Sequence, residues 1–397
     1  MSTQKSALLN NEGYAKMIEG DYHSAYRLLR QAVADDRDNH MAYNNLASTL
    51  KQLGREPEAI AIYERLVAEH PELAMPTNNL AFSRLRHGRY MEGWKLYGMR
   101  HHAKKTRLPN NPLTGRPVAK DPLPGLHDLV EKNVLIVPEQ GLGDEIFFLR
   151  FVPRLRLSVE PASIWYAPSP KAYPLLRRCP ELLEYCNLTD MAFSTAPRDN
   201  AVAIHLADLP LLLGHDGSWF PPSLNYDPPE PPQEGTLGVT WKAGNAELVH
   251  RGSIFKGIPP EALGRALSHV PYRIRVVQRG ATADELAAFS RGLDRDFDQF
   301  EPPPRIGSEL VALLECMGGL EQYVGVSNTN THLRAMLGRS QHVIVGLPGE
   351  WRWPVTHPTS SPWQPQMPVY RYDMQDEWEP ALERLTASLQ GREPSGR

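Results

Sequence analysis

The chain has 397 residues, of which 41% are hydrophobic and 22% charged, and its formal net charge is −3. This length exceeds what one ordinary core holds and predicts two or three domains, and the small net charge gives no reason to expect a nucleic-acid partner. No run of 18 apolar residues predicts a membrane span, and the first residues lack the apolar stretch of a secretory signal, so we expect a cytoplasmic protein.

Residues 1–100 repeat with a period of 34, and the third copy is truncated. This period, with small residues in fixed columns, is typical of tetratricopeptide repeats, which are pairs of antiparallel helices. The small residues are expected where two helices cross closely, and a glycine is expected to end the first helix of each pair. The columns are Asn10-Asn11, Asn44-Asn45 and Asn78-Asn79; Gly13, Ala47 and Ala81; Gly20, Gly54 and Gly88; and Ala25, Ala59 and Gly93.

Such repeats form a concave face, for which two roles are open. The face could bind a protein or peptide, or the three repeats could cap the rest of the chain or drive self-association.

Residues 101–130 are rich in proline, lysine and arginine and predict a linker. After them, apolar runs of strand length alternate with helical stretches, which predicts parallel sheets with right-handed crossovers. A proline-rich break near residues 220–235 divides this region into a first Rossmann-like lobe, 131–225, and a second, 236–380. The last helix and tail occupy 381–397. The predicted fold is therefore α followed by α/β, with an interlobe cleft at the carboxyl ends of the strands.

The run "PEQGLGDEIFF" follows the first predicted strand, so its glycines face the predicted cleft. Gly141 and Gly143 permit close approach to a ligand, and the following helix N-terminus offers N–H groups to an anion. Asp144 is either a group of the site or merely the N-cap of that helix. The G-x-G-x-x-G fingerprint is absent, which disfavours a dehydrogenase.

In the second lobe, polar groups follow two predicted strands. Lys242 comes after "TLGVTW" and is placed to reach a phosphate, although it could equally be a solvated loop residue. Five polar side chains crowd one helix N-terminus in "VGVSNTNTHLRAMLG", and capping needs only one of them. A diphosphate would account for the others, which makes Asn328, Thr329, Asn330, Thr331 and His332 candidate ligand contacts. His332 could instead simply pack inside the lobe.

Five segments, taken in order, resemble bacterial tetratricopeptide proteins with a glycosyltransferase-like carboxyl region. They are "GRYMEGWKLYGMRH", "EQGLGDEIFFLRFVPRL", "VTWKAGN", "VGVSNTNTHLRAMLG" and "EWRWPVTHPTSSPWQPQM". That region is similar to the ADP-heptose:lipopolysaccharide heptosyltransferases, and the layout resembles that of repeat-bearing O-GlcNAc transferases.

The resemblance implies a GT-B fold and transfer of a sugar from a nucleotide diphosphate to a hydroxyl of a protein or glycan, without a cofactor or metal. It implies that Asp144 is the catalytic base and that Lys242, Arg251 and the helix N-terminus at 329–331 neutralise the leaving diphosphate. No D-x-D follows a predicted strand, in agreement with metal independence.

Two residues depart from the pattern of these relatives. Asn328 stands where they usually carry an aspartate, and Lys242 is inserted between Trp241 and Ala243. The alternative function is therefore a catalytically degenerate protein whose repeats bind or assemble partners.

Two other features have structural interpretations. Trp351, Trp353 and Trp363, placed after the last predicted strand, either stack on a ligand or pack inside a proline-stiffened loop, and we favour packing. Cys179, Cys186 and Cys316 form no C-x-x-C pair and predict reduced thiols.

Overall fold

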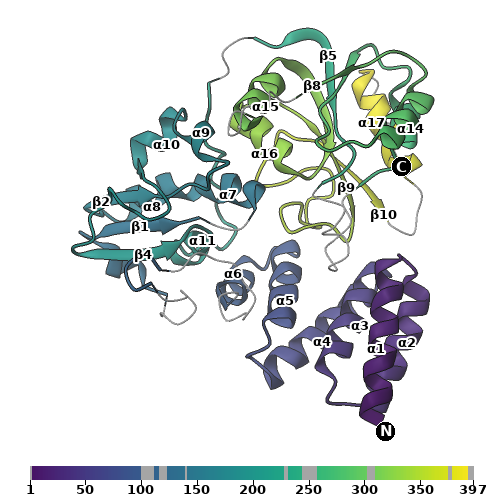
Figure 1. Cartoon of the computed structure of the whole chain (residues 1–397), viewed down its shortest axis with the longest axis horizontal. Coiled ribbons are helices and arrows are strands. Elements are labelled where there is room, and N and C mark those ends of the chain that lie inside the picture. Colours follow the sequence, from purple (N-terminus) through teal and green to yellow (C-terminus); the bar gives the residue numbers. More distant parts are fainter. Residues whose placement is uncertain are drawn as a thin grey trace.

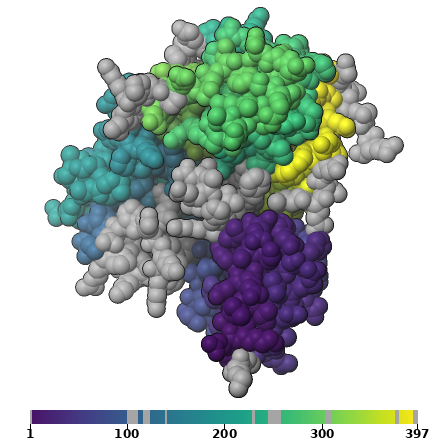
Figure 2. All heavy atoms as spheres, turned by 45° about the vertical axis from the view of Figure 1, so that its right-hand side comes forward, coloured from purple at the N-terminus to yellow at the C-terminus, as the bar shows by residue number. Residues whose placement is uncertain are grey.

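The computed structural model describes residues 2–99, 111–115, 123–138, 141–227, 231–243, 257–301, 309–373 and 378–391. Figure 1 shows a row of N-terminal helices beside two α/β lobes, each with its own sheet. In the space-filling view, the first helices (purple) form a block below the second lobe (green), as Figure 2 shows. The predicted order of helical repeats followed by a parallel α/β region is confirmed.

The repeat region consists of helices that pack each against the next in chain order. They are α1 (Ser2–Ile18), α2 (Tyr22–Asp35), α3 (His40–Gln52), α4 (Glu56–Glu69), α5 (Ala74–Arg86) and α6 (Tyr90–Gly98). Gly20, Gly54 and Gly88 follow the first helix of each pair with φ of 82°, 71° and 74°, the left-handed conformation that ends a helix. The helical hairpins predicted from the period of 34 are confirmed.

The small-residue columns lie where the helices of a pair cross. A Cβ at Gly13 would lie 2.7 Å from Leu29 Cγ, and one at Gly93 would lie 2.5 Å from Leu85 Cγ. The asparagine columns have a second role, because Asn45 donates to Asn10 across 2.9 Å and Asn79 donates to Asn44 across 3.0 Å. These amide pairs connect the first helices of successive repeats.

The first lobe is built on a four-stranded parallel sheet of order β3-β2-β1-β4. Its strands are β1 (Asn133–Val137), β2 (Ser163–Tyr166), β3 (Asn187–Leu188) and β4 (Ala201–His205). Its short helices are η3 (Leu126–Leu129), α7 (Leu142–Phe148), η4 (Leu149–Phe151), α8 (Val152–Ser158), α9 (Tyr173–Leu176), α10 (Pro180–Tyr185), η5 (Leu206–Asp208) and α11 (Leu209–Leu212). The strand order reverses between β1 and β4, the kind of position at which open α/β sheets bind ligands.

The second lobe is built on a six-stranded parallel sheet of order β10-β9-β8-β5-β6-β7. The strands are β5 (Gln233–Val239), β6 (Arg273–Val276), β7 (Asp298–Gln299), β8 (Leu320–Val326), β9 (His342–Leu347) and β10 (Val369–Asp373). The helices are α13 (Pro260–Leu267), α14 (Ala283–Leu293), α15 (Glu309–Gly318), α16 (Thr329–Met336) and α17 (Glu379–Leu389). The order reverses between β5 and β8, so the carboxyl ends of these two strands are the equivalent position in the second lobe.

Four strands lie where none was predicted, the two-residue strands β3 and β7 and the longer β4 and β10. The tryptophan-rich segment therefore does not follow the last strand, as expected, but lies between β9 and β10; we call residues 348–368 the β9–β10 loop. β5 begins at Gln233 and α17 at Glu379, near the proposed boundaries at 236 and 381, and the division into domains stays a prediction. The cysteines are free, as predicted, and burial raises the pKa of the Cys179 thiol to about 11.

One cluster of rings, which we call the aromatic junction, joins the third repeat to both lobes. Its members are Tyr90, Trp94, Phe147, Phe148, Phe151, His215, Phe220, Trp351 and Trp363. Trp94 and Trp351 have centroids 5.1 Å apart, and Trp94 Nε1 donates to His215 Nδ1 across 3.0 Å. Burial lowers the pKa of His215 to about 4, so the ring is neutral at neutral pH and suits the acceptor role.

Gly93→Ala should destabilise the repeats by about 1–3 kcal/mol, because the added methyl meets Leu85 where the neighbouring backbone leaves no room. The midpoint of thermal unfolding, followed by far-ultraviolet circular dichroism, measures the loss. Gly319→Ala is the matched control, since its methyl would meet its nearest atoms at 3.6 and 3.7 Å and should change stability by no more than about 0.5 kcal/mol. Equal midpoints in the two variants would contradict the close packing of α5 and α6.

Candidate functional site

The glycine loop lies at the carboxyl end of β1, beside the point where the strand order of the first sheet reverses. Gly141 precedes α7 with φ of 85°, a conformation that favours glycine. Asp144 is the third residue of α7 and makes no capping bond to the helix, because the N-cap position belongs to Gly141. The capping interpretation of Asp144 is therefore wrong, and its carboxylate is 41% exposed.

On the second lobe, three of the five polar side chains at the start of α16 bond within the lobe. Asn328 is the N-cap: its side chain accepts from the Asn330 backbone N–H at 2.9 Å and donates to Thr240 Oγ1 at 3.2 Å. Asn330 donates to Val277 O, and the Thr331 hydroxyl donates to Val326 O. Thr329 and His332 are the two that face the other lobe.

The two loops meet face to face. A Cβ placed on Gly143 would lie 3.3 Å from His332 Cδ2 and 3.6 Å from Thr329 Oγ1. The His332 ring also packs edge-on against Phe147, with centroids 5.7 Å apart. The structure thus brings together Gly141, Gly143, Asp144, Thr329 and His332 at the contact between α7 and the N-terminus of α16.

The β9–β10 loop adds a charged residue that was not singled out in the sequence. Arg352 is 7% exposed, forms an ion pair with Asp144, and lies over the rings of Phe147 and Trp351 at 4.6 and 4.4 Å. Burial favours neutral Arg352, but the carboxylates of Asp144 and Glu350 outweigh it and raise the pKa of the guanidinium. Arg352 therefore stays charged in an apolar setting.

Glu350 extends this pairing towards α16. Its Oε1 lies 3.6 Å from Arg352 Nη1 and accepts a hydrogen bond from the Ser327 hydroxyl, at the end of β8. A row of polar groups thus runs from β8 through Glu350 and Arg352 to Asp144.

Lys242 lies at the end of β5, but its ammonium binds Glu285 of α14 at 2.6 and 2.7 Å. Burial favours neutral Glu285, yet the hydrogen bonds from Lys242 and from the Thr282 backbone lower its pKa. The lysine expected at a phosphate therefore has a carboxylate partner inside its own lobe. Arg251, the other predicted phosphate contact, lies outside the described residues.

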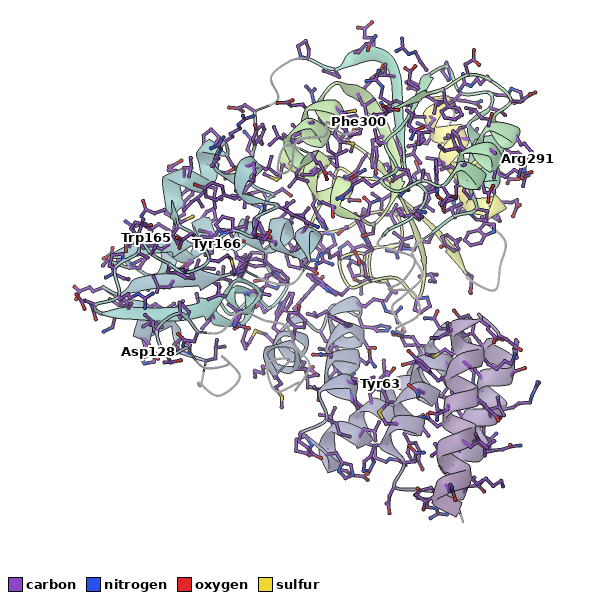
Figure 3. The ribbon with its side chains drawn as sticks, viewed as in Figure 1. Tyr63, Asp128, Trp165, Tyr166, Arg291 and Phe300 are labelled. Atoms are coloured by element: carbon purple, nitrogen blue, oxygen red, sulfur yellow. The ribbon has the colours of Figure 1, made fainter. Side chains whose placement is uncertain are left out.

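Glu145, the residue after Asp144, fastens α7 to the sheet of the first lobe. It is 1% exposed, and its Oε1 accepts from the Tyr166 hydroxyl at 2.6 Å and from the Ser169 backbone N–H at 2.8 Å. Tyr166 is labelled on that sheet in Figure 3. Burial raises the pKa of the Glu145 carboxyl.

Arg150 was also not predicted. It is buried and donates to Phe147 O, Trp363 O and Ser223 Oγ at 3.0, 3.1 and 2.7 Å. These bonds link α7 to the β9–β10 loop and to the segment between α11 and β5, which we call the interlobe connection. The sequence signal for Arg150 and Arg352 is a lone arginine inside an apolar run, "FFLRFV" and "EWRWP". Such an arginine must find partners when it is buried.

The tryptophans of the β9–β10 loop pack inside the protein, as favoured. Trp351, Trp353 and Trp363 are 5%, 1% and 3% exposed. Trp351 and Trp363 belong to the aromatic junction, and Trp353 packs with valines of β9 and β10. In the described structure these rings shape the loop that carries Arg352.

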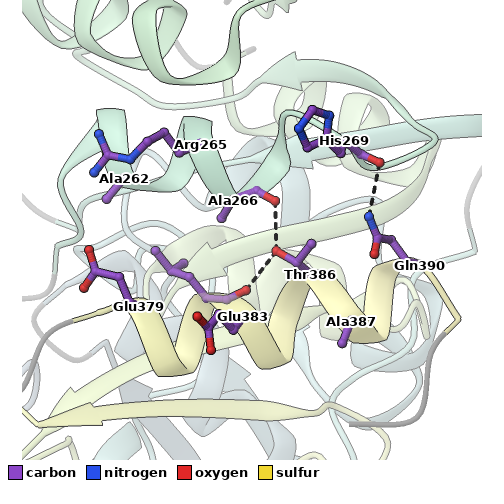
Figure 4. Close-up of a pocket in the computed structure, with 10 residues that line it drawn as sticks. Ala262, Arg265, Ala266, His269, Glu379, Glu383, Thr386, Ala387 and Gln390 are labelled. Atoms are coloured by element: carbon purple, nitrogen blue, oxygen red, sulfur yellow. Dashed lines mark hydrogen bonds between the residues drawn. The ribbon is translucent and has the colours of Figure 1, made fainter. Parts of the chain in front are cut away.

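Two pockets among the described residues lie away from this contact. One of about 410 Å³ lies between α13 and α17, where Thr386 Oγ1 donates to Ala266 O at 2.8 Å (Figure 4). Another of about 340 Å³ lies beside Phe220, Ala335 and Trp363. Neither contains a predicted site residue.

Two kinds of feature are absent from the described residues. No group of three histidine, cysteine, aspartate or glutamate side chains that could hold a metal lies among them. None of the helices in that part of the chain is long and apolar enough to cross a membrane.

The chain thus has an N-terminal row of helical hairpins followed by two Rossmann-like lobes that meet at α7 and the N-terminus of α16, the arrangement of a GT-B fold. Residues 16–75 match the tetratricopeptide repeat family. The chain is 25% identical over 388 residues to Protein FlbA of Caulobacter vibrioides, an alignment that covers 89% of this chain and 61% of FlbA. The chain thus spans about three fifths of the length of that relative.

Two solved structures are similar in outline. One is a glycosyl transferase family 9 protein from Veillonella parvula, with 13% identity, a TM-score of 0.43 and coverage of 68% of this chain and 92% of that one. The other is a mutant O-GlcNAc transferase from Thermobaculum terrenum, with 14% identity, a TM-score of 0.30 and coverage of 98% and 92%.

Glu145→Gln should raise the unfolding temperature at neutral pH, because the buried carboxylate is penalised there while the amide keeps an acceptor for Tyr166 and Ser169. The folded pKa of Glu145 is raised, so the stability it contributes is present below the unfolded value, about 4.3, and is lost as pH rises through the folded value. The advantage of glutamine should therefore shrink towards about pH 4.

The unfolding temperatures of wild type and Glu145→Gln, measured from neutral pH down to about pH 4, check the prediction. Glu184→Gln makes the same charge change on an exposed residue and should give no such pH-dependent gain. Parallel profiles for the two variants would contradict burial as the cause.

Proposed function

We propose that this protein is a glycosyltransferase that moves a sugar from a nucleotide-diphosphate donor to a hydroxyl of a protein or glycan acceptor. The observation that carries the proposal is the meeting of the Gly141–Asp144 loop with the N-terminus of α16. The loop follows β1 and α16 follows β8, and both of these strands lie where the strand order of their sheet reverses. Open α/β sheets bind ligands at such positions. The resemblance of these same segments to heptosyltransferases supports the reaction class.

The donor diphosphate would bind at the start of α16. The dipole of α16 favours an anion there, and the Thr329 hydroxyl and His332 ring face the same place across Gly143. Glycine at 143 leaves room, because any side chain would contact His332. The nucleotide sugar is a co-substrate in this proposal, and neither a cofactor nor a metal takes part.

Asp144 is the proposed base. Its carboxylate accepts the proton of the acceptor hydroxyl while that oxygen bonds to the anomeric carbon, and the bond from this carbon to the diphosphate oxygen breaks with its electron pair leaving on the diphosphate. Positive charge near the diphosphate stabilises the departing group. The partial exposure of Asp144 is consistent with access by an acceptor.

The repeats would select the acceptor. Tetratricopeptide repeats present a concave face, and here α6 is joined to both lobes through Trp94 and Tyr90 of the aromatic junction. A segment bound along the repeats would therefore keep a fixed relation to the interlobe contact.

A nucleoside diphosphate should raise the unfolding temperature if this function is right, because a ligand that binds only the folded state stabilises it by RT ln(1 + [L]/Kd), about 2.7 kcal/mol at a hundred times Kd. A thermal-shift panel of uridine, adenosine and guanosine diphosphates and their sugars makes the measurement. Intact-mass analysis of proteins captured by the repeats would then identify a modified acceptor. No shift with any of these compounds would contradict the proposal.

Asp144→Asn should reduce sugar transfer by about 10²-fold or more, because the amide does not accept the hydroxyl proton, while nucleotide binding is not lost. Turnover of the matching nucleotide sugar measures the first effect, and thermal shift measures the second. Retained turnover would remove Asp144 from the base role.

A second function, a partner-binding protein with a degenerate transferase fold, is favoured by the pairing inside the site. Asp144 is bound by Arg352, Lys242 by Glu285 and Asn328 by Thr240, so each has a partner without a ligand. Partner capture by the repeats without any nucleotide-induced shift would support it.

A further inference from the structure

We propose that Arg352 exchanges partners during the reaction: it binds Asp144 in the ligand-free protein and the donor diphosphate in the complex. The exchange rests on the proposed function and identifies the cation of that site. It also makes the availability of Asp144 depend on the presence of the donor.

The first argument is the incomplete pairing of Arg352. The residue is 7% exposed, and its Nε is buried without a hydrogen-bond partner. Its Nη2 binds Asp144, and its Nη1 lies 3.6 Å from Glu350, longer than a hydrogen bond. A buried guanidinium normally uses all of its donors. The unpaired Nε–H of Arg352 can therefore donate a hydrogen bond to a further anionic oxygen.

The second argument is position. Glu350 connects Arg352 to Ser327, which directly precedes the N-cap of α16, and Asp144 follows Gly143, where an added Cβ would lie 3.3 Å from His332 and 3.6 Å from Thr329. Arg352 is thus held between the two loops that form the proposed diphosphate site. A diphosphate at the start of α16 would lie next to a fork of N–H donors suited to phosphate oxygens.

The third argument is that the other described cations of this region are engaged. Lys242 is held by both oxygens of Glu285, and Arg150 donates to two carbonyls and the Ser223 hydroxyl. Arg352 is bound instead to a carboxylate that is 41% exposed.

The exposures of the two partners favour the exchange in this direction. Asp144 returns to water at small cost when it is released, because it is already partly solvated. Arg352 is buried and would be costly to leave unpaired, so it should change partners only when a second anion is at hand. The carboxylate then becomes free to take the acceptor proton after the donor has bound.

Isothermal titration with inorganic pyrophosphate and with uridine, adenosine and guanosine diphosphates tests the exchange. Asp144→Asn should bind the anion about three- to tenfold more tightly than wild type, because the ligand no longer competes with a carboxylate for Arg352. Arg352→Met should bind about tenfold more weakly or worse. In the double variant, Asp144→Asn should no longer tighten binding, since the contested partner is absent.

The matched control is Asp298→Asn with Arg273→Met. Asp298 is 42% exposed and pairs with Arg273 at 2.7 Å. This pair lies at the amino ends of β6 and β7, whereas α16 follows the carboxyl end of β8 in the same sheet. These variants should bind pyrophosphate as wild type does. Arg352→Lys, which keeps the charge but loses the fork, should fall between wild type and Arg352→Met and replaces the latter if methionine prevents folding.

The outcomes separate the two proposals. Wild-type binding of an anion, with Asp144→Asn unchanged or weaker, would overturn the exchange and leave the proposed function standing. The same tightening by Asp144→Asn in the Arg352→Met background would also overturn it. Absence of binding to pyrophosphate and to all three diphosphates would overturn both.

Discussion

The arrangement of this protein depends on the burial of the aromatic junction. Nine rings from the third repeat, α7 and η4, the interlobe connection and the β9–β10 loop pack against one another. Aromatic side chains bury more area than any others, and the edge-to-face contacts seen here are their favoured geometry. The junction therefore joins three parts of the chain into one core.

The charged groups of the site gain their character from this apolar setting. Arg352 and Arg150 both lie over the ring of Phe147, at 4.6 and 4.2 Å, and burial lowers the pKa of Arg150 to about 9. Water is largely excluded around them, so each must be matched by a carboxylate or by carbonyl oxygens. The same helix, α7, supplies Phe147 to the junction and Asp144 to the site, so loosening of the junction would displace the carboxylate.

Local patterns in the sequence were sufficient for much of the fold. The period of 34 predicted the helical hairpins because helix crossings select small residues at fixed places, and the apolar runs predicted β1, β2, β5, β6, β8 and β9. β10 was missed because "VYRYD" interleaves polar residues with tyrosines after a stretch rich in proline, a pattern of a partly exposed edge strand. Asp144, Thr329 and His332 were found after strand ends, but the meeting of α7 with the N-terminus of α16 depends on how the lobes dock.

The pairings of the site lie beyond such patterns. Asp144 and Arg352 are 208 residues apart, and Lys242 and Glu285, which are 43 residues apart, meet only in the folded lobe. Nothing local distinguishes a lysine that awaits a phosphate from one already bound to glutamate. Arg352 is the clearest case. An arginine between two tryptophans is recognised as a buried charge that needs an anionic partner only once the rings are known to be buried.

The attachment of α6 has a consequence for the growth of the repeat array. α6 is fastened at its own end, since Trp94 is bonded to His215 and Gly98 lies against Leu211, whereas α1 contacts other repeat helices. Extra hairpins could therefore be added or lost by gene rearrangement ahead of α1 without disturbing the lobes. An insertion between α5 and α6 would separate the array from the helix that is packed against the lobes. The reach of the array towards its partners is thus free to evolve in one direction only.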